Sequence, residues 1–199
     1  MLKFDLYNHT RKTFSKKLFE KLLKNSSAVL IKEKKMGRGQ KLFVELNLVG
    51  NSAITRINRT YRRKNQPTDV ISLSYFHGVL KSAFTERETL GSLKNKPFCR
   101  YQKHLIFDSP SSASPKSHGV RFGSATERVS RTFIGEIFIC VPYATKQAQK
   151  PGFTLNKELQ FLFIHGLLHI FGYDHKKPAD EKKMKRLEEE IFHGRGAGT

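Results

Sequence analysis

The chain has only 2 cysteines and no apolar run long enough to cross a membrane. Cys99 and Cys140 lie far apart and form no C-x-x-C pair, which argues against a disulfide framework and a cysteine-rich zinc site and favours a reducing compartment. The most apolar stretch, residues 159–171, is shorter than the roughly 20 residues of a membrane span and contains histidines. The N-terminus carries Asp5 and no long apolar segment, so no signal peptide is expected. We therefore expect a soluble, cytoplasmic protein with no membrane partner.

Acidic side chains are scarce as well, with 17 Asp and Glu against 37 Lys and Arg and a formal net charge of +20. Such an excess creates a positive field that attracts polyanions and supplies the sequence-independent part of nucleic-acid affinity. The alternative is that the charge serves solvation alone, because net charge speaks to non-specific binding and not to fold. Hydrophobic residues make up 38% of the 199 positions, which is enough for one well-filled core and argues against a disordered chain.

Hydrophobic periodicity predicts strands and helices on both sides of a central irregular region. Strands are expected at residues 2–7, 28–31, 41–49, 68–75 and 132–141. Helices are expected after Thr13, after a cap at Asn51 or Ser52, from Pro142, over 155–171 between a cap at Thr154 and a stop at Gly172, and from Pro178 onward. Because the two kinds of element do not alternate strictly, the pattern predicts an α+β fold. We expect a single domain over residues 1–193 with one sheet covered by helices.

The regular pattern breaks down between residues 77 and 131, where a Ser- and Pro-rich run at 109–117 and scattered basic residues replace the apolar spacing. Loops of this length inside a compact domain are uncommon and are usually functional or disordered. We therefore expect a basic insertion at 77–131 that is mostly a long loop, with residues 104–107 as a candidate strand. Residues 194–199 are expected to form a disordered tail.

Three histidines fall within 11 residues: His165, His169 and His175. Residues four apart on a helix share one face, so His165 and His169 can present two imidazoles to one point. Gly172 permits the left-handed turn that ends the helix, and the chain can then bring His175 back toward that face. Three imidazoles leave a fourth position open, as in catalytic zinc sites, where the ion lowers the pKa of a bound water toward neutrality. The spacing predicts one zinc ion per chain; the alternative is a set of ordinary core or solvent-facing histidines.

The residue after His165 is Gly166, so the glutamate that acts as general base in H-E-x-x-H peptidases is missing. A peptidase would need a carboxylate from Asp174 or Glu136 instead, which makes this function the least favoured. Asp174 has two open roles. It can hold a ligand imidazole, or it can cap the turn that leads to His175.

Residues 165–175, HGLLHIFGYDH, resemble the H-G-x-L-H-x-x-G-Y-D-H signature of the YbeY family, which comprises bacterial endoribonucleases and ribosomal-RNA maturation factors. Other segments resemble further parts of the family's pattern: 57–62 (INRTYR), 67–72 (PTDVIS), 135–140 (GEIFIC), and Met184 with Glu188 on the helix after the histidines. Two features depart from it. Leu73-Ser74 stands where the family usually has Phe-Pro, and the insertion replaces a shorter loop.

The resemblance implies a small mixed sheet, a zincin-like three-histidine site on the central helix and a zinc ion in an open cleft. It implies that His165, His169 and His175 are the metal ligands, with His165 also serving catalysis, and that Arg62 is the functional arginine. A guanidinium fork suits a phosphate, which supports this role for Arg62 on physical grounds.

The resemblance also implies single-strand-specific cleavage of RNA, maturation of the 3′ terminus of 16S rRNA and late-stage 70S ribosome quality control. The expected partners are RNA and the ribosome or its small-subunit proteins, and no DNA partner is expected. A second hypothesis keeps the site but makes the protein an RNA- or ribosome-binding assembly factor with a structural zinc, because no general base is obvious. A metallopeptidase is the third.

Overall fold

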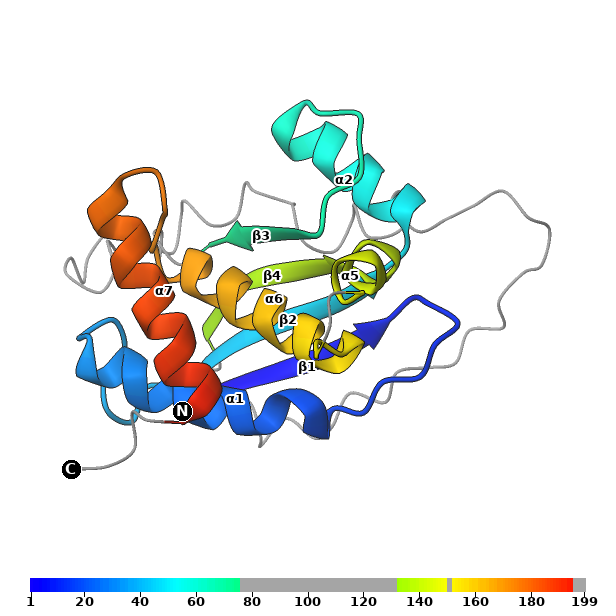
Figure 1. The fold of residues 1–199 in the computed structure, drawn as a ribbon. Helices are drawn as coiled ribbons and strands as arrows, with labels where there is room; N and C mark the ends of the chain where they lie inside the picture. Colours follow the sequence, from blue (N-terminus) through cyan, green and yellow to red (C-terminus); the bar gives the residue numbers. More distant parts are fainter. Residues whose placement is uncertain (76–131, 150–151, 195–199) are drawn as a thin grey trace, which may run out of the picture.

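The computed structural model describes residues 1–75, 132–149 and 152–194. The insertion expected at 77–131, its candidate strand at 104–107 and the tail beyond residue 194 lie outside these residues. Within them, no helix combines the length and the apolar character that crossing a membrane requires. The elements (Figure 1) are β1 (Leu2–Asn8), α1 (Lys17–Lys32), β2 (Leu42–Val49), α2 (Asn51–Arg62), β3 (Val70–Ser74), β4 (Thr132–Cys140), α5 (Val141–Gln147), α6 (Leu155–Ile170) and α7 (Pro178–His193).

The strands form one mixed sheet in the order β1-β2-β4-β3. β1, β2 and β4 run parallel, whereas β3 pairs with β4 in the antiparallel sense. The central strands β2 and β4 are buried along most of their length, as is usual for parallel strands covered by helices. Figure 1 shows α1, α6 and α7 together on one side of the sheet, while α2 and α5 follow the carboxyl ends of β2 and β4. The predicted α+β fold with a sheet covered by helices is confirmed.

α6 is the central helix and is buried on nearly every side. Its Phe163 ring packs against Phe19 of α1 and Phe4 of β1, with centroid distances of 5.3 and 5.9 Å. Successive residues of β4 point to opposite faces of the sheet. Ile137 therefore joins the core with α6, whereas its neighbour Phe138 belongs to a smaller apolar cluster with α2. Apolar packing on both α1 and the sheet thus holds α6 in position.

Gly166 allows α6 to lie close to the sheet. A Cβ atom at this position would stand 2.8 Å from Ser72 Oγ of β3 and 2.9 Å from Ile137 Cγ2 of β4, closer than ordinary contact distances. A side chain here would push α6 away from the sheet. Because Gly166 faces β3 and β4, its neighbour His165 lies on another side of the helix.

The ends of α6 agree with the sequence prediction. Thr154 caps the helix, since its hydroxyl accepts a hydrogen bond from the N–H of Lys157 at 3.3 Å. Gly172 has a φ of 82°, so it makes the left-handed turn after the helix. α7 starts at Pro178, as expected. The turn at Gly172 and the start of α7 at Pro178 therefore determine how the chain continues after α6.

The prediction for the N-terminal helix is wrong at both ends. The helix starts at Lys17, later than expected after Thr13, and it continues through residues 28–31, which the sequence suggested as a strand. Val29 lies seven residues after Leu22, so it extends the same apolar helix face. A short apolar run by itself does not distinguish a strand from a buried helical turn.

The predicted cap of α2 is also wrong. The N-cap is Gly50, and no side chain caps the first turn. Asn51, which the sequence suggested as the cap along with Ser52, uses its Oδ1 to accept a hydrogen bond from the Cys140 thiol at 3.1 Å. This contact ties the start of α2 to the end of β4.

Candidate metal centre

The open face of α6 carries one ring on each successive turn: Phe161, His165 and His169. Residues 162–164 and 166–168 are buried in the core, so between 161 and 170 the helix leaves this face accessible. After the turn at Gly172 the chain reverses, as the sequence predicts, and the third histidine returns to the same place.

The three histidine side chains meet at one point. One ring nitrogen from each of His165, His169 and His175 lies within 4.8 Å of the other two. The Nε2 atoms of His165 and His169 are 3.1 Å apart. Two ligands of a tetrahedral zinc with bonds of about 2.0–2.1 Å stand roughly 3.3 Å apart, so this separation suits a shared metal ion.

The second ring nitrogen of two of these histidines is already engaged. His165 Nδ1 lies 2.7 Å from Glu188 Oε1, and His169 Nδ1 lies 2.9 Å from the backbone carbonyl of Tyr173. A carboxylate and a carbonyl can only accept, so each Nδ1 carries the proton and donates it. In the neutral imidazoles both Nε2 atoms then carry lone pairs that face each other, an arrangement that a cation stabilises.

The state of His169 suits metal binding. Its burial, followed by the neighbouring His165, lowers the pKa of His169 below the ordinary value for an imidazole. The neutral imidazole is the form that ligates metals. The three residues present therefore fit a divalent metal ion, and this chemistry does not by itself fix which metal is bound.

Glu188 contacts a site histidine, a role that the match of Glu188 to the family pattern did not reveal. It lies on the buried side of α7 beside Met184 and Leu187, where a carboxylate is unusual unless it is paired. The hydrogen bond to His165 accounts for a carboxylate at this buried position. An acidic residue on an otherwise apolar helix face, one turn after Met184, is the sequence signal that would have revealed it.

Replacing Glu188 with alanine is expected to lower the affinity for metal about ten- to a hundredfold, because the partner that orients His165 is lost. Glu188→Gln keeps an acceptor but no charge and should fall between Glu188→Ala and the parent chain. Isothermal titration of the metal-free protein with zinc measures both. Glu189 is exposed on the same helix, so Glu189→Ala is the matched control and should bind as tightly as the parent. Equal affinities in all four proteins would contradict the assignment.

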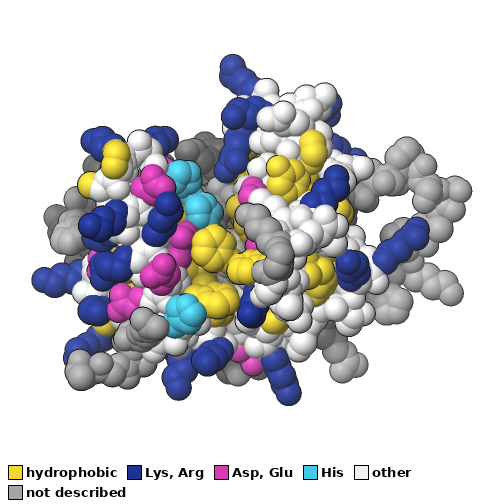
Figure 2. All heavy atoms as spheres, viewed as in Figure 1, with side chains coloured by type: hydrophobic (Ala, Val, Ile, Leu, Met, Phe, Trp, Pro, Cys, Tyr) yellow, Lys and Arg dark blue, Asp and Glu magenta, His cyan; other side chains and the backbone are white. Residues whose placement is uncertain are grey.

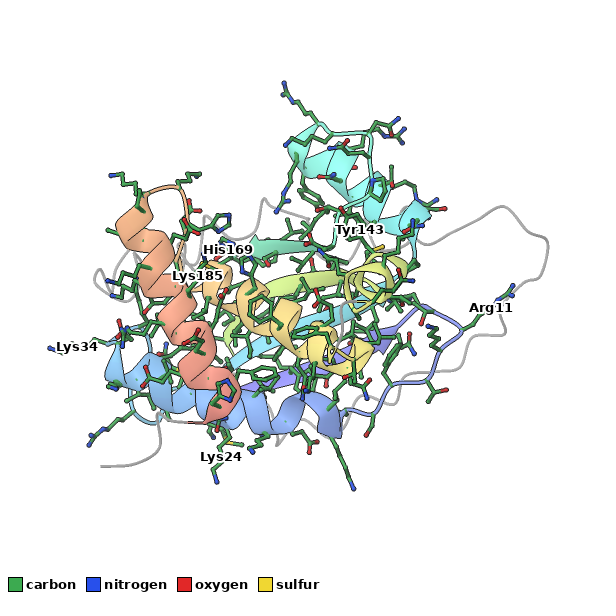
Figure 3. The ribbon with its side chains drawn as sticks, viewed as in Figure 1. Arg11, Lys24, Lys34, Tyr143, His169 and Lys185 are labelled. Carbon is green, nitrogen blue, oxygen red and sulfur yellow. The ribbon has the colours of Figure 1, made fainter. Side chains whose placement is uncertain are left out.

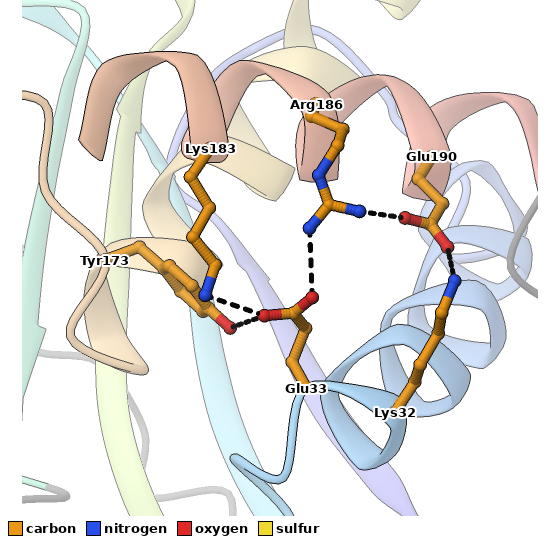
Figure 4. Close-up of polar contacts among 6 residues, drawn as sticks. All are labelled: Lys32, Glu33, Tyr173, Lys183, Arg186 and Glu190. Atoms are coloured by element: carbon orange, nitrogen blue, oxygen red, sulfur yellow. Dashed lines mark hydrogen bonds and ion pairs between the residues drawn. The ribbon is translucent and has the colours of Figure 1, made fainter. Parts of the chain in front are cut away.

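The carbonyl that holds His169 is itself anchored. The hydroxyl of the buried Tyr173 donates to Glu33 Oε2 at 3.4 Å, and Glu33 is ion-paired with Lys183 at 2.9 Å and Arg186 at 3.0 Å (Figure 4). Lys183 and then Arg186 hold the pKa of Glu33 below its usual value, while burial and the nearby Glu33 raise the pKa of Tyr173 to about 12. The ion pairs continue through Arg186, Glu190 and Lys32. The turn that carries the acceptor carbonyl is thus tied to both α1 and α7.

Neither carboxylate considered for a peptidase occupies the place of its base. Asp174 Oδ1 accepts a hydrogen bond from the N–H of His175 at 2.8 Å, and Oδ2 pairs with Lys176 at 2.9 Å, so Asp174 caps the turn. Glu136 is buried and accepts from the Tyr75 hydroxyl at 3.1 Å. Of the two roles open to Asp174, the structure shows the capping role.

The histidines line a cavity of about 830 Å³. Arg62, from the last turn of α2, lines the same cavity, so the structure brings together every site residue that the sequence predicted. Figure 2 shows histidine side chains beside apolar ones, with Lys and Arg side chains over α7 on one side and over α2 on the other. His169 of α6 and Lys185 of α7 both belong to this cavity (Figure 3).

The basic groups at the cavity differ in their pairing. Lys176 and Lys185 are engaged, the first by Asp174 and the second by Glu181 at 2.6 Å. Arg62 is exposed, and in the part of the chain that the structure describes it forms no ion pair. The guanidinium of Arg62 is therefore available to an anionic ligand in the cavity.

Comparisons with known proteins identify the family of the chain. The family model described as endoribonuclease YbeY matches residues 5–196. The endoribonuclease YbeY of Streptococcus mutans is 33% identical over 151 residues, covering 76% of this chain and 74% of that protein. That of Heliobacterium modesticaldum is 30% identical over 153 residues, covering 77% and 69%. A Streptococcus pneumoniae protein of the same name is 33% identical over 162 residues, covering 81% and 80%.

A solution structure from Thermotoga maritima aligns with 98% of this chain and 91% of that one at 21% identity, but its TM-score of 0.45 is too low to support an argument. The family model and the relatives establish the family, because the model matches nearly the whole chain and the relatives are matched over at least 69% of their length. The resemblance noted in the sequence is confirmed: the chain belongs to the YbeY family of endoribonucleases.

Proposed function

We propose that this chain is a zinc-dependent endoribonuclease that cleaves single-stranded RNA at the three-histidine site. The observation that carries the proposal is the 3.1 Å separation of the Nε2 atoms of His165 and His169 in a cavity that also holds Arg62. The name shared by the relatives supports RNA as the substrate. We further propose a cytoplasmic role in maturing the 3′ terminus of 16S rRNA and in late-stage 70S ribosome quality control, with the ribosome or its small-subunit proteins as partners.

His165, His169 and His175 would hold the zinc ion. When bound there, zinc supplies Lewis-acid polarisation of a phosphate oxygen and lowers the pKa of a water. The remaining chemistry belongs to the chain itself. Arg62 offers two N–H groups of one guanidinium to a phosphate and stabilises the charge that develops on it. Glu188 fixes the tautomer and the ring orientation of His165.

The charge of the chain supports a polyanionic substrate. The formal net charge of +20 gives a general attraction to RNA, while contacts to phosphates position the strand without reading its sequence. The open Arg62 is the group best placed to hold a phosphate at the histidines, because the cavity lysines Lys176 and Lys185 already have carboxylate partners.

The alternative function, an RNA- or ribosome-binding assembly factor with a structural zinc, has one observation in its favour. The acidic residues around the cavity are engaged: Asp174 and Glu181 by lysines, Glu188 by His165, and Asp69 by Gln147 at 3.2 Å. No carboxylate among them stands ready as a general base. The removal of the metal separates the two functions.

Chelation of the metal is expected to leave a folded protein that does not cleave RNA. The core around α6 is complete without an ion, so the Tm should fall by roughly 5–10 °C, the size expected when a tight ligand is lost from a domain of this length. Circular dichroism and a gel assay with single-stranded and duplex RNA measure the two effects, and added zinc should restore cleavage of the single strand. Unfolding on chelation would instead support the structural role. Cleavage by the metal-free protein would contradict the proposal.

A further inference from the structure

Phe161 is an aromatic side chain that the core does not use. It lies on α6 four residues before His165 and lines the same cavity, yet 37% of its surface is exposed. It belongs to neither apolar cluster of the described residues, although its neighbours Leu162 and Phe163 are buried. No aromatic ring in the described ranges stacks against it. The ring is therefore accessible to a ligand in the cavity.

The ring is close to the metal ligands along the helix. Four residues of α6 span about 6 Å, so Phe161 is one turn from His165 on the same face. Among the described residues, the two other apolar side chains that line the cavity are Val70 of β3 and Met184 of α7, which are almost wholly buried and offer little surface. Phe161 is thus the main apolar surface that the described part of the chain presents to a ligand in the cavity.

One cation at the cavity, Arg62, suits an anionic strand as that ligand. Arg62 lies at the same cavity with no ion-pair partner in the described chain, so a phosphate can bind on one side of the histidines while an aromatic group rests on Phe161. A basic group beside an accessible aromatic ring is the usual pairing for single-stranded nucleic acid, because bases stack on the ring and cations follow the backbone.

We propose that Phe161 is a stacking platform for an unpaired nucleobase of the RNA held at the histidines. This inference rests on the proposed function, in that RNA is the ligand, and it adds the group that selects single strands. A base inside a duplex is stacked on its neighbours and cannot lie on the ring, whereas an unpaired base can. Phe161 acts in binding and takes no part in the transfer of protons.

The test compares Phe161→Ala, Phe161→Leu and Phe161→Trp in the metal-loaded, full-length protein. The probe is a short fluorescein-labelled single-stranded RNA, used intact and in a series with one abasic nucleotide at each position in turn, and binding is recorded by stopped flow before cleavage. Phe153 precedes α6, is 40% exposed and does not line the cavity, so Phe153→Ala is the matched control.

We expect Phe161→Ala and Phe161→Leu to weaken binding of the intact RNA roughly tenfold, with Phe161→Trp and Phe153→Ala close to the parent. For one abasic position, the parent and Phe161→Ala should bind equally, because the base that stacks is gone. The salt dependence of the RNA affinity should be the same in Phe161→Ala and the parent, since the ring contacts no phosphate. The metal content should also stay at the parent level.

Several results would overturn the inference. Unchanged binding of the intact RNA by Phe161→Ala is one, and an equal loss on every abasic RNA is another, since the ring would then shape the cavity without touching a base. A loss of bound metal in Phe161→Ala would also assign the ring a structural role. A separate result would contradict the proposed function. If the parent protein binds RNA through Phe161 but does not cleave it, the stacking role of Phe161 stands and the nuclease activity is wrong.

Discussion

Replacement of His169 by alanine is expected to abolish metal binding and to lower the rate of RNA cleavage more than about a thousandfold. His169 Nε2 is one of three nitrogens that converge within 4.8 Å. The loss of a group that only orients a ligand costs about ten- to a hundredfold in metal affinity, so the loss of a ligand itself costs more. His165→Ala should behave in the same way. Metal analysis of the purified variants and a cleavage assay on single-stranded RNA measure both effects.

The fold should survive this substitution. His169 Nδ1 makes one hydrogen bond, to the carbonyl of Tyr173, and its loss costs about 1 kcal/mol of the free energy of unfolding. His193 is exposed at the end of α7 and does not line the cavity, which makes His193→Ala the matched control with normal metal content and cleavage. Undiminished cleavage by a folded, metal-free His169→Ala protein would place catalysis elsewhere in the chain.

The meeting of the three histidines was predictable because their arrangement is local. The spacing of His165 and His169 follows from the pitch of a helix, and Gly172 fixes the turn that returns His175. Propensity and spacing act over a few residues, and these three histidines lie within 11 positions. The same locality explains why the limits of α6 agree with the expectation, since Thr154 and Gly172 act at its two ends.

The partners of these histidines were not predictable, because they depend on packing between distant segments. Glu188 reaches His165 only because α7 folds back beside α6, and the tether from Tyr173 to Glu33 joins the histidine turn to α1. Nothing near His165 in the sequence specifies that contact. The direction of β3 is a similar case: it pairs with β4, which begins at Thr132, long after β3 has ended at Ser74.

Gly166 illustrates a sequence feature whose cause lies in the fold. The sequence shows that a catalytic glutamate is missing after His165. The structure adds that no side chain fits there, because Ser72 Oγ and Ile137 Cγ2 would meet it at 2.8 and 2.9 Å. The close approach of α6 to β3 and β4 therefore conflicts with the base of an H-E-x-x-H peptidase.

Replacement of Arg62 by alanine is expected to lower kcat for RNA cleavage about a hundred- to a thousandfold while leaving the metal content unchanged. Arg62 lines the cavity of the histidines but belongs to α2, so its loss does not disturb α6 or α7. A guanidinium that stabilises charge developing on a phosphate acts mainly in the transition state, which is why kcat should fall more than the affinity. The slope of the logarithm of RNA affinity against the logarithm of salt concentration should decrease by about 0.7, the contribution of one phosphate contact on a single strand.

Two further variants separate the charge of Arg62 from its shape and position. Arg62→Lys keeps the charge but loses the planar fork, so its kcat should lie between those of the parent and Arg62→Ala. Arg59 is exposed on the same helix and does not line the cavity, so Arg59→Ala should leave kcat unchanged even if it weakens RNA binding at low salt. Steady-state kinetics of the four proteins at two salt concentrations measures these differences. Equal kcat values in the parent and Arg62→Ala would show that Arg62 does not stabilise the charge that develops on the phosphate.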